Sequence, residues 1–354
     1  MEKLDIITAL SHEFGTGDYV CGGGGNTSCK SETTLWVKPS GTTLSGLTPE
    51  KFITIDRSKL ASLYKIAAPA VAAEREALVK SIMDEATLSE TAGRASVEAP
   101  LHDALSALYV VHTHPFIVNG MTAAKDGKVV CKQLFPDALW LDYVDPGYTL
   151  CMVVSKEIEL YQERNGREPE LIFLKNHGVF VSADSPERIR ELYAEVMTTL
   201  NARYAEYGLN ADLEISSACS EALAEASMTL IRSIMDNQDL FIVSAGLFDV
   251  APGPISPDHM VYAKAYPYVG QPTEDGLAEF VARYGYAPQV FVFNQSVFGV
   301  AESEKGARLA LELAKDGAVV KKLCTAFGGV NYMSDSAREF IENWEVESYR
   351  KKQV

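Results

Sequence analysis

Three histidines of the 354-residue chain have the types and spacing of metal ligands. His112 and His114 flank one residue in the apolar segment Val110-Val-His-Thr-His-Pro, and alternate residues of a strand point to the same side. His177 follows a second apolar segment and precedes a glycine. Three neutral imidazoles with an open fourth position are typical of catalytic zinc. The alternative is a pair of ordinary polar strand residues, so the metal-site prediction requires the two segments to be adjacent.

A carboxylate and a further histidine lie upstream, in Arg94-Ala-Ser-Val-Glu98-Ala-Pro-Leu-His102. Ser96 is a predicted N-cap and Pro100 is tolerated in a first helical turn, which puts Glu98 and His102 on one helix face. Glu98 could act as a general base beside a metal-bound substrate, or merely stabilise the helix dipole. His102 could be a fourth ligand, a residue that supports the ligands, or a buried core histidine, and we expect the last.

The glycine-rich segment 22–25 fits neither common nucleotide motif. Ser28 stands where a dinucleotide fingerprint needs glycine, and Lys30 lacks the preceding glycine of a P-loop. Segments 26–30 and 35–39 instead predict a hairpin that places Gly25–Ser28 opposite Ser40–Thr43. Backbone amides freed by glycines, together with hydroxyl and amide donors, would form an anion-binding nest. The alternative is two turn sequences at strand ends.

Charge and composition exclude several classes of partner. Lys and Arg total 32 against 48 Asp and Glu, giving a formal net charge of −16, which disfavours nucleic acid. Any phosphate site must therefore be built locally. No apolar stretch approaches the roughly 20 residues of a membrane span. The six cysteines have no paired spacing and the N-terminus shows no signal peptide, so we expect reduced thiols and a cytoplasmic location.

Alternating helices and strands predict an α/β protein with a boundary near residue 215, giving domains 1–215 and 216–354. In the first domain we expect helices at 4–14, 47–61, 96–108 and 185–207, and strands at 26–30, 35–38, 110–113 and 171–174. In the second, smaller α/β domain we expect helices at 220–235 and 304–313, strands at 240–243 and 289–293, and a helix between those strands.

These segments, in this order and spacing, resemble the class II aldolase/adducin family over about residues 5–205. The resemblance rests on Gly24-Gly-Asn-Thr-Ser28, Val37-Lys-Pro-Ser-Gly41, Ser96-Val-Glu98-x-x-x-His102, Val111-His-Thr-His114-Pro and Asn176-His177-Gly. The rest resembles the aldolase part of bifunctional rhamnulose-1-phosphate aldolase/alcohol dehydrogenase proteins. That second resemblance rests on Ser256-Pro-Asp-His259 with Lys264, on segments 140–148 and 289–299, and on 341–347.

The resemblance implies a three-layer α/β/α fold around a mixed sheet, and a homotetramer with active sites at subunit interfaces. It implies Zn²⁺, or another divalent transition metal, on His112, His114 and His177, with Glu98 as the acid/base residue. It also implies a phosphate site whose members are Asn26, Thr27, Ser40, Gly41 and Ser96.

The implied function is that of a lyase that reversibly cleaves a ketose or deoxyketose 1-phosphate, such as rhamnulose 1-phosphate. The products are dihydroxyacetone phosphate and an aldehyde, formed through a zinc-stabilised enediolate. The same family also includes 4-epimerases, decarboxylases, dehydratases and non-catalytic adducin-like modules.

Two features of the implied lyase stay open. Fuculose-phosphate-type aldolases protonate the aldehyde with a tyrosine, but segment 133–135 has none, leaving Tyr143, Tyr148 or Tyr332 as substitutes. A nearly dry site would raise the pKa of Glu98, whereas zinc would lower it.

Overall fold

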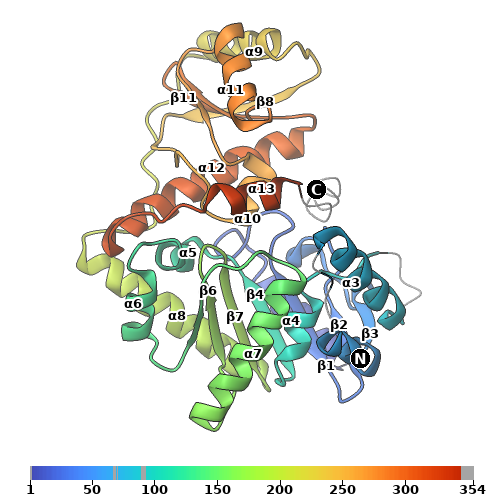
Figure 1. The fold of residues 1–354 in the computed structure, drawn as a ribbon. Helices are drawn as coiled ribbons and strands as arrows, with labels where there is room; N and C mark the ends of the chain where they lie inside the picture. The colour runs from blue at the N-terminus through green and yellow to red at the C-terminus, as the bar shows by residue number, and fades with distance from the viewer. Residues whose placement is uncertain (1, 67–68, 70, 89–92, 344–354) are drawn as a thin grey trace. The chain divides into compact units, whose positions relative to one another are not determined.

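The computed structural model describes residues 2–66, 69, 71–88 and 93–343. The chain forms two compact units (Figure 1). The described residues up to 118 and residues 128–200 form the first unit, and residues 119–127 and 201–343 form the second. The predicted domain division at residue 215 stays a prediction.

The first unit is built on a seven-stranded mixed sheet, as predicted. The strand order is β3-β2-β1-β4-β7-β6-β5, and every neighbouring pair is antiparallel except β5 and β6. The strands are β1 (Asn26–Lys30), β2 (Thr34–Val37), β3 (Ile53–Asp56), β4 (Tyr109–Thr113), β5 (Leu139–Leu141), β6 (Leu171–Leu174) and β7 (Gly178–Ala183).

Helices cover both faces of this sheet, so the three-layer α/β/α architecture is confirmed. On one face, α1 (Glu2–Glu13) and α8 (Pro186–Glu206) pack where Phe14 and Tyr193 stack with ring centroids 4.1 Å apart. The other face carries α3 (Ala72–Ala86), α4 (Ala99–Ala104) and α7 (Tyr148–Asn165). Shorter elements are α2 (Arg57–Leu60) and the 3₁₀ turns Leu44–Gly46, Pro49–Lys51 and Ala61–Lys65. Two further helices, α5 (Phe116–Thr122) and α6 (Gly127–Leu134), each contain residues of both units.

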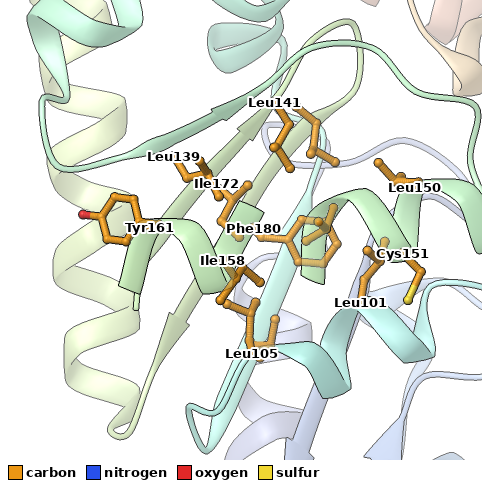
Figure 2. Packing of buried hydrophobic residues seen from close by; sticks show 13 residues of the cluster. Leu101, Leu105, Leu139, Leu141, Leu150, Cys151, Ile158, Tyr161, Ile172 and Phe180 are labelled. Carbon is orange, nitrogen blue, oxygen red and sulfur yellow. The ribbon is translucent and has the colours of Figure 1, made fainter. Parts of the chain in front are cut away.

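The main core of the first unit lies between the sheet and α7 (Figure 2). Ile158 and Leu150 of α7 pack with Leu101 of α4 against Ile172 and Phe180 of the sheet. All five side chains are at most 3% exposed. Because Phe180 also faces His112, this core supports the candidate site directly.

The strand register decides which polar residues share a face. The predicted hairpin of β1 and β2 is confirmed, with Ser28 opposite Val37. On its other side β1 pairs with β4, so that Asn26 lies opposite His112. Since side chains alternate along strands, Asn26, Ser28 and His112 all point toward α4.

The helix predicted at 47–61 is wrong. This stretch contains the 3₁₀ turn Pro49–Lys51 and then β3, in which Ile53 and Ile55 are buried and alternate with partly exposed residues. That period of two suits a sheet strand, and β3 pairs with β2. Asp56 then caps α2 by accepting hydrogen bonds from the backbone amides of Ser58 and Lys59.

The helix predicted at 96–108 is shorter than expected and begins later. It runs only from Ala99 to Ala104, and Glu98 rather than Ser96 is the N-cap residue. The buried Lys30 ammonium donates hydrogen bonds to the carbonyls of His102 and Leu105, which satisfies acceptors at the end of the helix. A lysine from β1 therefore fixes where α4 stops.

The second unit contains a four-stranded sheet, which confirms a smaller α/β region after the first. Its order is β8-β11-β10-β9, from β8 (Phe241–Gly246), β9 (Tyr268–Val269), β10 (Val290–Phe293) and β11 (Ser296–Ala301). The helices are α9 (Glu221–Ile234), α10 (Pro257–Ala263), α11 (Glu274–Tyr284), α12 (Glu304–Cys324) and α13 (Asp335–Asn343), with a 3₁₀ turn at Thr325–Phe327. Residues 344–347 of the second resemblance lie outside the described residues.

Helices lie on both faces of the smaller sheet. Ile231 of α9 packs with Ile242 and Phe298 on one face. On the other face α12 approaches so closely that a Cβ atom on Gly299 would lie 2.3 Å from the Ala307 carbonyl oxygen. None of the helices in the described ranges is long and apolar enough to cross a membrane.

Segment 119–127 belongs to the second unit although its sequence neighbours belong to the first. The backbone amide of Lys125 donates to the Gly329 carbonyl at 2.9 Å, and the amide of Asn331 donates to the Ala123 carbonyl at 2.7 Å. Cys324 Sγ lies 4.0 Å from the Asn119 carbonyl oxygen, 205 residues away in sequence. The second unit is therefore assembled from two separate stretches of chain.

The Ile172→Ala variant should lower the free energy of unfolding by about 2–5 kcal/mol, because Ile172 is 1% exposed and its removal leaves a cavity beneath α7. Val129→Ala is the control, since Val129 is 60% exposed and should change this free energy by under about 0.5 kcal/mol. Urea unfolding measures both values. Equal effects from the two substitutions would contradict the packing described.

Candidate functional site

Three imidazoles meet at one end of the sheet in the first unit. The ligand atoms of His112, His114 and His177 all lie within 4.8 Å of one another. His112 belongs to β4, His114 follows it, and His177 stands in the turn between β6 and β7. Because β7 pairs with both β4 and β6, the adjacency that the metal-site prediction requires is present. The donor set therefore fits a divalent transition metal.

The ring of His112 is fixed by its surroundings. Its Nδ1 lies 3.0 Å from the Val179 carbonyl oxygen, which can only accept a hydrogen bond, so Nδ1 is protonated and Nε2 faces the other imidazoles. The ring stacks on Phe180 with centroids 3.9 Å apart. Burial lowers the pKa of His112, which keeps the imidazole neutral, and the neutral form binds metals.

Two glycines permit the close approach of backbone on which the cluster depends. A Cβ atom on Gly178 would lie 2.3 Å from the Thr113 carbonyl oxygen, so only glycine fits directly after His177. Gly25 has a φ of +66° and a Cβ atom there would lie 2.8 Å from the His112 carbonyl oxygen.

The Glu98 carboxylate lies beside the three imidazoles. Its Oε1 is 3.5 Å from His112 Nε2 and 3.6 Å from His177 Nε2, while Asn26 Nδ2 donates a hydrogen bond to Oε2. Burial raises the pKa of Glu98, whereas the nearby imidazoles lower it. The imidazoles have the larger combined effect, so the pKa of Glu98 lies well below its ordinary value. Glu98 is therefore a carboxylate at neutral pH.

His102 lies behind the cluster and is not one of the three grouped ligands. It is fully buried, as expected, and its Nδ1 lies 2.8 Å from Ser28 Oγ. Its ring packs edge-on against Phe180, with centroids 5.4 Å apart. Phe180 therefore lies between this core histidine and the stacked ring of His112.

The residues predicted to hold phosphate are only partly brought together. A backbone bridge between Pro39 and Ala95 brings the Ser40 and Gly41 loop next to Ser96. Ser96 Oγ accepts a hydrogen bond from the Glu98 amide at 3.2 Å, which ties it to the same cluster as Asn26. The Ser40 amide is already used, since it donates to the Arg94 carbonyl at 2.8 Å.

Thr27 is the predicted phosphate residue whose side chain points away. Its hydroxyl lies 2.7 Å from Ser11 Oγ of α1, on the opposite face of the sheet from Asn26 and Ser28. The physical reason is strand alternation, since Thr27 stands between two residues that face α4. The side chain of Thr27 is therefore not part of the cluster around Glu98.

Lys38 is a residue at this site that the sequence analysis did not single out. It is 1% exposed, and its ammonium group donates to the Gly23 carbonyl at 3.2 Å and the Thr42 carbonyl at 2.7 Å. It thereby joins the glycine-rich loop to the loop containing Ser40 and Gly41. The sequence signals that could have found it were a lysine next to the buried strand residue Val37 and its place in the segment Val37-Lys-Pro-Ser-Gly41.

Comparison with known proteins gives one family match and several distant relatives. The sequence model described as "Class II Aldolase and Adducin N-terminal domain" matches residues 5–204. A Bacillus subtilis protein named "Uncharacterized oxidoreductase YuxG" is 22% identical over 412 aligned residues, which cover 98% of this chain and 58% of that protein. The chain therefore spans less than two thirds of this relative.

Two solved structures illustrate the structural comparison. The N-terminal class II aldolase domain of a conserved protein from Thermoplasma acidophilum is 22% identical, with a TM-score of 0.49, covering 56% of this chain and 92% of that domain. L-fuculose-1-phosphate aldolase from Thermus thermophilus is 15% identical, with a TM-score of 0.37, covering 56% of this chain and 93% of the other.

In the His102→Asn variant, the free energy of unfolding should fall less steeply than in the wild type as the pH is lowered below about 6.5. Burial lowers the pKa of His102 well below 6.5, so the folded protein does not take up a proton that the unfolded chain binds. The contribution of neutral, buried His102 to the free energy of unfolding is complete above about pH 6.5. It is lost as the pH falls below that value, by up to about 1.4 kcal/mol per pH unit, because the unfolded chain then binds the proton. Urea unfolding at a series of pH values measures the slope. Identical slopes for the variant and the wild type would contradict the assignment.

Proposed function

Because the chain belongs to the class II aldolase and adducin family, whose match covers more than half of its length, we propose that it is a metal-dependent lyase. The proposed reaction is the reversible cleavage of a ketose or deoxyketose 1-phosphate, such as rhamnulose 1-phosphate, into dihydroxyacetone phosphate and an aldehyde. The observation that carries this proposal is the Glu98 carboxylate, 3.5 and 3.6 Å from two of three clustered imidazoles.

In this proposal His112, His114 and His177 hold a divalent cation, for which zinc is the expected ion. Their nitrogen donors and their mutual distances suit that role. When bound, such an ion supplies Lewis acidity toward the substrate carbonyl. The imidazole of His112 is held neutral by burial and is aligned by the Val179 carbonyl, so its Nε2 can bind a metal without losing a proton.

Glu98 is the proposed acid/base residue. Asn26 holds one carboxylate oxygen, which leaves Oε1 on the side of the imidazoles. In the condensation direction this oxygen would accept the proton from the carbon of dihydroxyacetone phosphate that forms the new bond. In the cleavage direction the protonated carboxyl would return it to the same carbon. A fixed carboxylate at this distance contributes by position as well as by basicity.

The substrate phosphate is proposed to bind at the two joined loops, with Asn26, Ser40, Gly41 and Ser96 as partners. Thr27 would contribute only through its backbone, because its hydroxyl bonds to Ser11. The buried ammonium of Lys38 supports this placement, since it brings a positive charge behind both loops in a protein of net charge −16.

We further propose that the protein forms a homotetramer and is located in the cytoplasm.

A panel of ketose 1-phosphates tests the reaction. The purified chain should contain about one transition metal ion per chain, and it should release dihydroxyacetone phosphate from at least one member, as measured with a coupled dehydrogenase assay. Chelation should abolish release and added zinc should restore it. Metal-free protein with full activity would exclude the mechanism. Bound metal without release from any sugar phosphate would move the assignment to the family's epimerases, decarboxylases or dehydratases.

The Glu98→Gln variant should keep the metal and lose turnover. Glutamine can still accept a hydrogen bond from Asn26, but it cannot carry the proton, so we expect kcat to fall by about 10²–10⁴-fold. Metal analysis and steady-state kinetics on the same preparation measure both properties. His112→Ala is the matched comparison, in which metal content itself should fall. Turnover near the wild-type value in Glu98→Gln would show that another group moves the proton.

A further inference from the structure

The second unit contains a pocket that the proposed lyase site does not use. It is open to solvent on one side, offers about 30 Å³ to water-sized groups, enough for about two of them, and lies against α10 and α12. Its walls are mostly aliphatic and include Ile255, Leu313 and Ala314. Two polar side chains also line it, His259 and Lys264, both from the Ser256-Pro-Asp-His259 segment and its continuation. An apolar pocket with a few convergent polar groups is the usual form of a small-molecule site.

Lys264 brings an unusual positive charge to this pocket. It directly follows α10 with a φ of 67°, a backbone conformation that lysine rarely adopts and that persists only where the surroundings impose it. The side chain is half-buried, and its ammonium lies 4.7 Å from the centre of the Tyr286 ring. Among the residues that the structure describes, none accepts a hydrogen bond from this ammonium or forms an ion pair with it.

The carboxylate that acts on Lys264 electrostatically is already engaged. Glu342 accepts a hydrogen bond from Arg338 Nη1 at 2.8 Å through one of its two carboxylate oxygens. A half-buried ammonium group is costly unless an oxygen atom compensates it. The pocket therefore presents a cation to whatever enters it.

The other polar side chain at the pocket, His259, lies against polar groups of the fold. His259 Nε2 lies 3.0 Å from Asp316 Oδ1, and His259 Nδ1 lies 2.7 Å from Ser256 Oγ. Gly317 leaves space for this ring, because a Cβ atom there would lie 3.2 Å from His259 Cδ2. Because no described residue accepts a hydrogen bond from the Lys264 ammonium, an anionic ligand suits this pocket better than a cationic one.

We propose that this pocket is a second ligand site that takes a short-chain monocarboxylate, with its carboxylate on Lys264 and its aliphatic body against Ile255, Leu313 and Ala314. The small volume excludes large ligands. A single ammonium group among aliphatic walls suits one negative charge, whereas a phosphate dianion requires several donors. This site does not depend on the proposed lyase activity.

Isothermal titration of the full chain with sodium propionate tests the proposal. We expect binding in the millimolar range, because a ligand this small makes few contacts. Propionamide, which has nearly the same shape without the charge, should bind much more weakly. Inorganic phosphate distinguishes the ligand class, and phosphate binding that depends on Lys264 and exceeds propionate binding would overturn the carboxylate assignment.

Two variants locate the binding. Lys264→Met keeps the length of the side chain and removes its charge, and it should weaken propionate binding by about tenfold to a hundredfold. Ala314→Leu fills the pocket without changing any charge and should abolish binding. Lys305→Met is the matched control, since Lys305 is exposed at the start of α12 and its loss changes the net charge equally.

Circular dichroism tests whether each variant folds. If Ala314→Leu does not fold, Lys264→Met alone decides whether the proposal holds. Propionate binding that is absent from the wild type, or unchanged in folded Lys264→Met or Ala314→Leu, would overturn the proposal. Loss in these two variants with retention in Lys305→Met would support it.

Discussion

The candidate site depends on the register of one central strand. β4 pairs with β1 on one side and β7 on the other, which places His112 between Asn26 and Phe180. A shift of one residue in either pairing would turn these side chains to the opposite face, toward α1 and α8. The register is held from both faces, because His112 and Val110 enter the core under α7 while Thr113 bonds to Tyr193 on the other side. The chemistry is thus positioned by the same alternation that builds the core.

The cost of burying these polar groups is largely offset by partners from another element, although Asn26 Oδ1 and His102 Nε2 have no hydrogen-bond partner among the described residues. Asn26 of β1 binds the Glu98 carboxylate before α4, Ser28 binds His102 within α4, and Lys30 binds the carbonyls at its end. One strand therefore holds one short helix at three successive inward-facing positions. Such a network is rigid when it is complete, and it is destabilised strongly when one member is lost. This rigidity keeps Glu98 at a fixed distance from the imidazoles.

Local patterns predicted much of this arrangement, and non-local pairing accounts for what they missed. The His-x-His spacing and the two apolar segments were sufficient to predict the imidazole cluster, and the polar turn at residues 31–34 was sufficient for the hairpin. The helix at 47–61 failed because Thr48 and Pro49 start only a 3₁₀ turn, while pairing with β2 makes residues 53–56 a strand. Asn26 as the partner of Glu98 could not be read from sequence, since 72 residues separate them. The same holds for Lys38, whose bonds to two loops have no periodic signature.

The interleaving of the two units has a consequence for how the chain is made. Segment 119–127 belongs with residues near 324–331, so its partners leave the ribosome about 200 residues later. At about 5–20 residues per second, this corresponds to a delay of roughly 10–40 seconds. During that time the strands on either side of the segment can already pair, whereas Gly120, which packs against Tyr204 and Leu323, must wait for its contacts. Segment 119–127 therefore lacks these packing partners until α12 has been synthesised.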